Sequence, residues 1–269
     1  MSSKAVKVRG RTVSVYEAGQ GEPLVYLHGI ADMHGIVGQP QPFHAALAGD
    51  RRLIAPAHPG CAGSDEDGTL ESMEDLVFHY LEVFDALGLG RFDLAGSCVG
   101  GWLAAEIAIR HPERVNRLAL IGATGLFVPG RPIGDLFMAV QPSDGNLAAL
   151  RAMLFREAES PLARTLFPDD GGDAEAGLLK YKAFRFAARI GFQPPYFYHR
   201  KLRDRLYRHP GPALVIHGAA DAMVPRDHAE AYAAGLGGAR LSIIAGCGHS
   251  PHLEDAAATA GQIRAFLAS

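Results

Sequence analysis

The sequence contains a series of short apolar runs without polar alternation, and this series limits the fold more than any other feature. Strands buried on both faces of a sheet carry such continuous runs. Two earlier segments alternate apolar with polar residues instead, which predicts a half-buried hairpin turning near Gly10. The continuous runs are Leu24–Leu27, Arg52–Ala55, Phe92–Ala95, Val115–Ile121, Ala213–Ile216 and Leu241–Ala245, and the alternating segments are Val6–Val8 and Val13–Tyr16. Together they predict about eight strands.

Helical patterns separate most of these runs. They cover Ser72–Leu87, Val99–Arg110, Arg226–Leu236 and Ala256–Ala268. Strand and helix in alternation favour a parallel sheet with helices on both faces. We therefore expect an α/β fold with a mostly parallel, twisted sheet.

One long segment interrupts this alternation. Residues 125–208 contain no convincing strand, and they contain helical candidates at Asn146–Glu157, Ala174–Ile190 and His199–Tyr207. We interpret the segment as a helical cap, or lid, inserted between two strands. The predicted core is then residues 1–124 together with 209–269.

Composition and charge limit the cellular compartment and the binding partners that we expect for the protein. The chain has 269 residues and a formal net charge of −3, which gives no long-range attraction to nucleic acid or to anionic membranes. It has no signal-peptide pattern and no apolar run near the ~20 residues that span a bilayer. Three cysteines at irregular spacing argue against a disulfide framework. We expect a cytoplasmic protein without a cofactor or a metal, and the sequence leaves its oligomeric state open.

The segment most informative about function surrounds Cys98. An apolar strand runs directly into a helical pattern through Gly96-Ser97-Cys98-Val99-Gly100. A turn this short holds its central residue in a strained conformation with the side chain above the sheet. The residues two before and two after must be very small. Glycines satisfy this around Cys98, whereas Ala95 and Val99 would be the flanking residues of Ser97.

The predicted position also suits a reactive thiol. Cys98 would begin a helix, where the backbone N–H groups and the helix dipole favour an anion. The alternative is a buried, inert cysteine, which is the commoner fate of a single cysteine.

A nucleophile needs a base and a group that orients the base. His249 follows the last apolar run on a glycine-containing loop, and we favour it over His252, which already begins the next helix. Asp221 follows the run that ends at Ile216, at the edge where α/β sheets build their sites. A carboxylate there would hold the imidazole in one tautomer. The alternatives are a surface histidine and an N-cap aspartate.

Charge that develops on a substrate carbonyl needs hydrogen-bond donors fixed in advance. We expect the backbone N–H of Val99, directly after Cys98, to supply one donor. The N–H of Ile30, on the loop His28-Gly29-Ile30, is predicted to supply the other.

The order nucleophile, acid, histidine with an upstream His-Gly loop resembles the α/β-hydrolase superfamily. The segment His58–Ser64 is similar to its proline-glycine loop, His217–Pro225 to its acid loop and Gly248–Glu254 to its histidine loop. Most such proteins have serine at the turn. In having cysteine at the turn, the chain resembles dienelactone hydrolases and polyester synthases. The sequence also allows an engineered replacement of serine.

These residues predict an acyl hydrolase in which Cys98 forms a thioester with the substrate acyl group. An ester is the expected substrate, and a lactone, a thioester or a carbon–carbon bond flanked by ketones stays open. A thioester is receptive to amines and thiols, so an acyltransferase is the main alternative. A non-catalytic ligand receptor is a weaker one.

Aromatic and apolar residues of the predicted cap are candidates for substrate contacts, although packing against the core explains most of them. We expect a small or medium acyl compound, moderately apolar and not strongly anionic. A zinc site at Cys61, Cys98, Cys247 and His249 is disfavoured because their spacing is not that of a zinc site. The candidate contacts are Phe127, Phe137, Met138, Phe192 and Tyr196.

Overall fold

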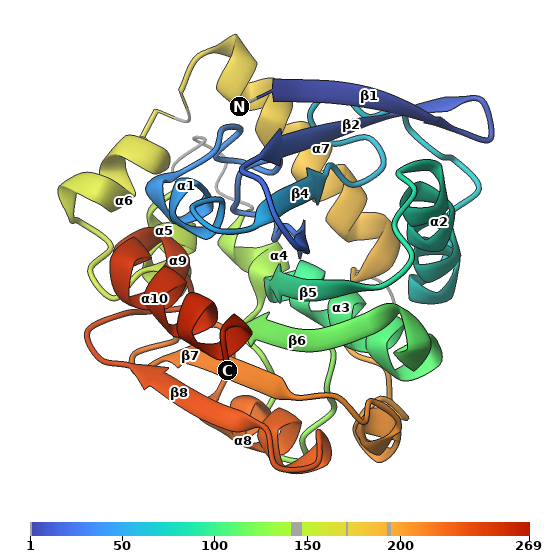
Figure 1. Cartoon of the computed structure of the whole chain (residues 1–269). Coiled ribbons are helices and arrows are strands. Elements are labelled where there is room, and N and C mark those ends of the chain that lie inside the picture. The colour runs from blue at the N-terminus through green and yellow to red at the C-terminus, as the bar shows by residue number, and fades with distance from the viewer. Residues whose placement is uncertain (1, 141–146, 171, 193–194) are drawn as a thin grey trace.

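The computed structural model describes residues 2–140, 147–170, 172–192 and 195–269, and it contains one sheet of eight strands (Figure 1). The order across the sheet is β1-β2-β4-β3-β5-β6-β7-β8. The strands are β1 (Ser2–Val8), β2 (Arg11–Ala18), β3 (Pro23–Leu27), β4 (Arg52–Pro56), β5 (Phe92–Ser97), β6 (Val115–Ile121), β7 (Ala213–Gly218) and β8 (Arg240–Ile244).

The sheet is mixed and mostly parallel, as the sequence predicts. β1 and β2 form the expected hairpin, with Val6 opposite Val13, and β2 lies antiparallel to β4. All other neighbouring strands run parallel. The carboxyl ends of β3, β5, β7 and β8 therefore meet at one edge, where the loops with the candidate residues begin.

Helices cover both faces of the sheet. Successive residues of a strand point to opposite sides, so each strand packs against both layers of helices. In β3, Leu24 and Tyr26 pack with α1 (Pro42–Leu47) and α10 (Ala256–Leu267). Their neighbours Val25 and Leu27 pack into the second core, which contains α2 (Met73–Ala86), α3 (Cys98–Arg110) and α8 (Arg226–Gly235). Figure 1 shows α10 in front of the sheet and α3 behind it. The predicted α/β architecture is confirmed.

Residues 125–208 carry no strand in the part that the structure describes. Backbone hydrogen bonds join the two ends of the segment, from Gly125 N to Phe197 O at 3.0 Å and from His199 N to Gly125 O at 2.9 Å. We call this segment the insert, and its treatment as a separate cap stays a prediction. Its helices are α4 (Leu136–Ala139), α5 (Ala148–Leu154), α6 (Pro161–Leu166), α7 (Ala174–Ile190) and the 3-10 helix η2 (Arg203–Arg208).

The predicted helices of the insert are correct to different degrees. Ala174–Ile190 has the predicted bounds, and α5 lies inside the predicted Asn146–Glu157, of which Asn146 is outside the described residues. The helical candidate at His199–Tyr207 is correct only in part, since its helix is the 3-10 helix η2 and begins at Arg203. So short a segment gains little from α-helical propagation. The brief helices α1, α4 and α6 were not expected from the sequence.

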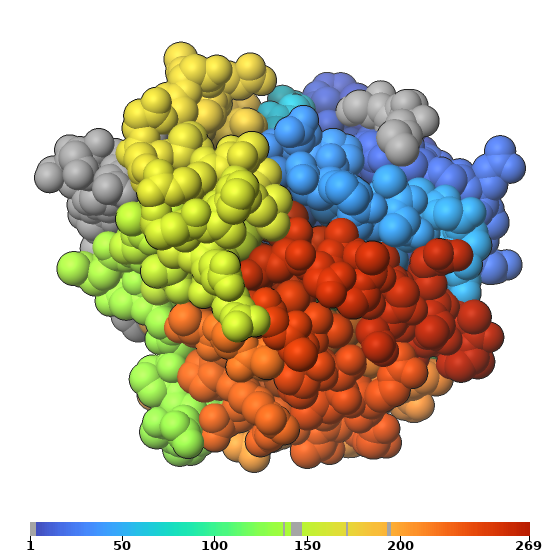
Figure 2. All heavy atoms as spheres, turned by 90° about the vertical axis from the view of Figure 1, so that its left-hand side faces the viewer, coloured from blue at the N-terminus to red at the C-terminus, as the bar shows by residue number. Residues whose placement is uncertain are grey.

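The insert packs against the loop that carries His249. The N–H of Ser250 donates to Leu154 O at 3.0 Å, and α9 (Pro251–Glu254) follows this loop. Figure 2 shows the yellow-green part of the insert directly against the red C-terminal segment. No helix among the described residues is long and apolar enough to cross a membrane.

Candidate active site

The chain turns sharply where β5 enters α3, and Cys98 is the residue at the turn. Its φ is +50°, which places a non-glycine residue in the left-handed region. A Cβ on Gly96 would lie 2.4 Å from Gly100 O, and one on Gly100 would lie 2.1 Å from Leu27 O. Both flanking positions therefore admit only glycine, as the sequence argument requires.

Ser97 does not occupy the turn. It has φ −111° and ψ 144°, so it remains in the extended conformation of β5. The strained conformation belongs to Cys98, whose side chain is largely buried and 9% exposed. The candidate nucleophile is thus the cysteine, and its catalytic role remains a prediction.

His249 and Asp221 approach from two other loops. Nδ1 of His249 lies 2.9 Å from Oδ2 of Asp221. The other oxygen, Oδ1, accepts the N–H groups of Met223 at 2.9 Å and Val224 at 2.8 Å, so its own loop fixes the carboxylate. Because a carboxylate only accepts, Nδ1 carries a proton and Nε2 is left for chemistry.

The electrostatics of this pair favour the charged forms. Burial opposes the charged ring, but Asp221 and the Cys98 side chain raise the pKa of His249 well above its usual value. Burial also opposes the charged carboxylate, yet His249, His217 and the N–H of Val224 lower the pKa of Asp221. The pair is therefore ionic over a wide pH range.

Cys98 and His249 line the same cavity. Nε2 of His249 has no hydrogen-bond partner of good geometry among the described residues, although the nearby thiol contributes to the raised pKa. The arrangement has a sulfur nucleophile, an imidazole and an orienting carboxylate in the order that acyl transfer needs.

The two predicted oxyanion donors are free in the described part of the chain. Neither Ile30 N nor Val99 N donates a hydrogen bond to another described residue. The Ile30 loop passes directly over the turn, since a Cβ on Gly29 would lie 3.0 Å from Ser97 Oγ and 3.1 Å from Cys98 Cβ. The geometry leaves both N–H groups available near the sulfur.

The rest of the cavity lining is mainly apolar. It contains no lysine or arginine among the residues that the structure describes. The residues around Cys98 and His249 are Gly29, Ile30, Ala31, Ile36, Ser97, Leu136, Leu150, Leu154, Met223, Ser250 and His252.

The predicted aromatic contacts lie elsewhere. Phe127 and Tyr196 line a separate hollow beside Pro132. Met138 is 64% exposed, and Phe192 packs against the core. The side chain of Phe137 lies outside the described part of the structure. None of the four described side chains lines the Cys98 cavity, and a role in substrate binding stays a prediction for the set.

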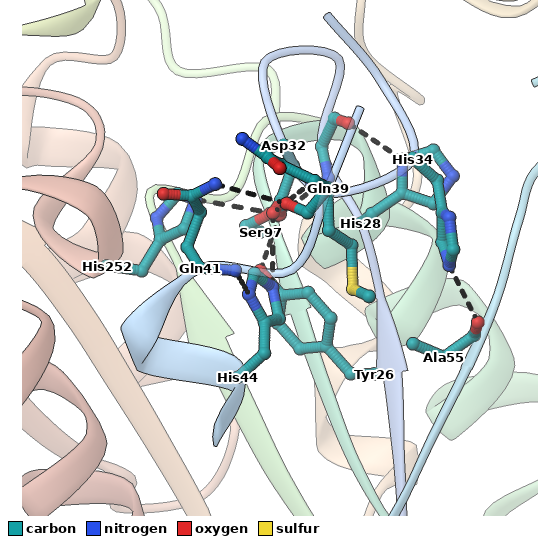
Figure 3. Close-up of polar contacts among 12 residues, drawn as sticks. Tyr26, His28, Asp32, His34, Gln39, Gln41, His44, Ala55, Ser97 and His252 are labelled. Carbon is teal, nitrogen blue, oxygen red and sulfur yellow. Dashed lines mark hydrogen bonds and ion pairs between the residues drawn. The ribbon is translucent and has the colours of Figure 1, made fainter. Parts of the chain in front are cut away.

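Sequence reasoning missed the leucines of the insert that line the cavity, because they belong to short helices without any motif. It also missed a buried polar network around Asp32. This carboxylate is fully buried and accepts the hydroxyls of Tyr26 at 2.6 Å and Ser97 at 2.7 Å (Figure 3). An aspartate three residues after Gly29 was the only signal in the sequence.

The two other cysteines are not part of this arrangement. Burial raises the pKa of Cys61 to about 12, and burial with nearby Glu254 and Asp255 raises that of Cys247 to about 11. Within the described residues, no group of three or more histidine, cysteine, aspartate or glutamate side chains is arranged to hold a metal ion.

Comparison with known proteins places this geometry in context. The family model for the alpha/beta hydrolase fold matches residues 22–256. A 2-hydroxymuconate semialdehyde hydrolase of Pseudomonas putida is 30% identical, over 98% of this chain and 94% of its own. A pimeloyl-[acyl-carrier protein] methyl ester esterase of Aromatoleum aromaticum is 32% identical, over 84% and 93%.

Solved structures show the same fold. An esterase from a Rhodococcus species superposes with a TM-score of 0.80 at 23% identity, covering 100% of this chain and 99% of that one. A meta-cleavage product hydrolase from Pseudomonas fluorescens gives 0.77 at 22% identity, with 98% and 97% covered.

Proposed function

Because this chain belongs to the α/β-hydrolase fold family, we propose that it hydrolyses uncharged carboxylic esters through a thioester on Cys98. The observation that carries the proposal is the convergence of Cys98 and His249 in one apolar cavity, with Asp221 bonded to the far side of the ring.

The proposed reaction has two halves. The thiol proton of Cys98 is held on Nε2 of His249, whose charge Asp221 offsets, and Sγ bonds to the carbonyl carbon while the carbonyl oxygen becomes an oxyanion held by the N–H groups of Ile30 and Val99. The C–O bond of the ester then breaks, and the alkoxide takes the proton from His249. Water attacks the thioester, gives a proton to His249 and releases the acid as the thiol is restored.

The charges around the cavity favour a neutral substrate over an anionic one. A buried anion needs a cation or several donors to offset its lost hydration. Burial lowers the pKa of the cavity residue His252 to about 4, so this ring is neutral at pH 7. The charge of His249 is already paired with Asp221. A neutral acyl group therefore fits this cavity better than a carboxylate does.

Carbon–carbon bond hydrolysis is the second candidate. It is favoured by the similarity to the semialdehyde hydrolase and to a 2-hydroxy-6-oxo-2,4-heptadienoate hydrolase of Pseudomonas putida, 26% identical over 99% of this chain. A dienoate carries a carboxylate, for which the described lining offers no lysine or arginine. We therefore rank the ester above the dienoate.

Acyl transfer uses the same residues and differs only in the final acceptor. A thioester reacts readily with amines and thiols as well as with water. Product partition between water and an added amine or thiol separates the two activities.

A panel of p-nitrophenyl esters, followed by intact mass, tests the proposal. We expect turnover and an acyl adduct on Cys98. Cys98→Ala should abolish both, whereas Cys98→Ser should keep the turn and form an ester that reacts less with amines. His249→Ala should cost several orders of magnitude in rate. Undiminished turnover by Cys98→Ala would refute the assigned nucleophile, and preferred cleavage of the dienoate would favour the second candidate.

A further inference from the structure

Asp32 is a buried carboxylate beside the candidate site, and the proposed chemistry gives it no role. It lies on the loop after β3, and both side-chain oxygens are surrounded by donors (Figure 3). Oδ2 accepts the hydroxyls of Tyr26 and Ser97 and the N–H of Gly29, the last at 3.2 Å. Oδ1 accepts the N–H of Met33 at 2.7 Å.

Two histidines complete the surroundings of this carboxylate. The N–H of Gln41 donates to Nδ1 of His44, so the proton of a neutral ring is on Nε2, which lies 3.2 Å from Oδ1 of Asp32. Nε2 of His252 lies 3.6 Å from Oδ2. Burial opposes the charge, but His252, His44 and Tyr26 hold the pKa of Asp32 well below its usual value.

The donors come from two separate parts of the chain, and each part carries one proposed oxyanion donor. Gly29 precedes Ile30, and Ser97 precedes the Cys98–Val99 turn. A single oxygen, Oδ2 of Asp32, bonds to both Gly29 and Ser97. One carboxylate atom therefore links the two halves of the oxyanion hole beyond the end of the β3–β5 pairing.

A second contact fixes the same loop from the other side. Ile36 N donates to Ile30 O at 2.8 Å, so the loop folds back on itself around Asp32. The peptide that carries the N–H of Ile30 has Gly29 O as its carbonyl, and Nδ1 of His28 lies 2.8 Å from that oxygen. The bond from Gly29 N to Asp32 holds the peptide before it.

We propose that Asp32 is a positioning residue that fixes the Ile30 loop to the Cys98 turn and so orients both N–H donors of the oxyanion hole. This inference rests on the proposed acyl hydrolysis. The carboxylate does not touch the substrate. It acts through Gly29 and Ser97, which lie next to the groups that do.

The kinetic test compares three variants on an ester and on its matched thionoester, in which sulfur replaces the carbonyl oxygen. Asp32→Asn keeps the side-chain volume but places an amide N–H₂ group against the N–H and O–H donors. Ser97→Ala removes the hydrogen bond between Asp32 and the turn. Tyr26→Phe is the control, because it removes an equally short bond to Oδ2 and leaves the bonds from Gly29 and Ser97 to that oxygen in place.

We expect Asp32→Asn and Ser97→Ala to lower kcat by about tenfold or more, with KM within about threefold. Their preference for the ester over the thionoester should fall, since a misplaced pair of donors discriminates less between oxygen and sulfur. Tyr26→Phe should keep that preference. An unchanged preference in both Asp32→Asn and Ser97→Ala would overturn the proposal, because a purely structural defect lowers both rates together.

Amide hydrogen exchange separates this inference from the proposed function, since it needs no turnover. Exchange over residues 28–36 should be about tenfold faster in Asp32→Asn than in wild type, with exchange over α10 unchanged. If the wild type formed no acyl-enzyme, the proposed chemistry would fail while this measurement still decided the role of Asp32. Unaltered exchange in residues 28–36 would overturn it. Ser97→Ala serves for the same measurement if Asp32→Asn does not fold.

Discussion

The carboxylate of Glu254 accepts a hydrogen bond from the backbone N–H of Arg156 at 2.8 Å, which joins the insert to the loop of the candidate base. Its other oxygen accepts the N–H of Gly248 at 2.6 Å, one residue before His249. This half-buried side chain thus joins the insert to the histidine loop, together with the bond from Ser250 N to Leu154 O.

Glu254→Gln should weaken this junction. The amide oxygen can satisfy one N–H, but the amide nitrogen faces the other and leaves it unpaired, at a cost of about 1–3 kcal/mol. Thermal and denaturant unfolding measure the loss. Glu230→Gln, which disturbs an exposed pair with Arg226, is the control and should change stability by less than about 0.5 kcal/mol. Equal effects of the two variants would contradict this role of Glu254.

Asp221→Asn should keep its loop and still disable the base. Its oxygen can accept the N–H groups of Met223 and Val224, which turns the amide N–H₂ toward Nδ1 of His249. The ring then accepts at Nδ1 and carries its proton on Nε2, the wrong tautomer for a base. We expect a rate loss of as much as about 10⁴-fold, measured as kcat/KM on the best ester. A loss below tenfold would argue against Asp221 as the orienting residue.

The Asp221–His249 pair should also give a defined pH dependence of stability. The raised pKa of His249 contributes stability that is present below its ordinary 6.5 and is lost as pH rises through the folded value. The lowered pKa of Asp221 contributes stability above its ordinary 3.8. The difference in unfolding free energy between wild type and Asp221→Asn should be largest between these values and shrink toward alkaline pH. A difference that grows toward alkaline pH would contradict the assigned shifts.

Buried neutral histidines should make the protein sensitive to acid. Burial lowers the pKa of His34 from 6.5 to about 4, so the unfolded chain binds its proton first and stability falls as pH drops below 6.5. His34→Gln retains a donor for Ala55 O, which Nε2 contacts at 2.9 Å. Between pH 8 and pH 5 the unfolding free energy of this variant should fall by about 2 kcal/mol less than that of wild type. Urea unfolding at both pH values measures this, and equal losses would disprove it.

Thiol labelling should distinguish the three cysteines. Burial raises the pKa of Cys61 and of Cys247 to about 12 and about 11, and thiolate is the reactive form. Cys98 is the most exposed of the three and opens into the cavity. Native iodoacetamide labelling, mapped by peptide mass, should modify Cys98 before the others. Initial labelling of Cys61 would contradict the proposed access to the sulfur.

The sequence determined the features that depend on neighbours along the chain. Continuous apolar runs defined the strands, and the Gly96–Gly100 spacing located the turn at Cys98, because a Cβ at either glycine would meet backbone oxygen. The positions of Asp221 and His249 followed from the strands that precede them. Their contact at 2.9 Å agrees with that reasoning.

Only the tertiary structure decided what depends on distant segments meeting. Donors at Tyr26, Gly29 and Ser97 converge on Asp32 because β3 and β5 are neighbours in the sheet. A single aspartate in the sequence does not predict these donors. Leu150 and Leu154 line the cavity because α5 packs on the histidine loop, whereas the more conspicuous Phe127 lies in another hollow. Local steric limits depend only on a residue and its near neighbours in the sequence. A binding surface is formed by side chains from separate segments, so it exists only after the chain has folded.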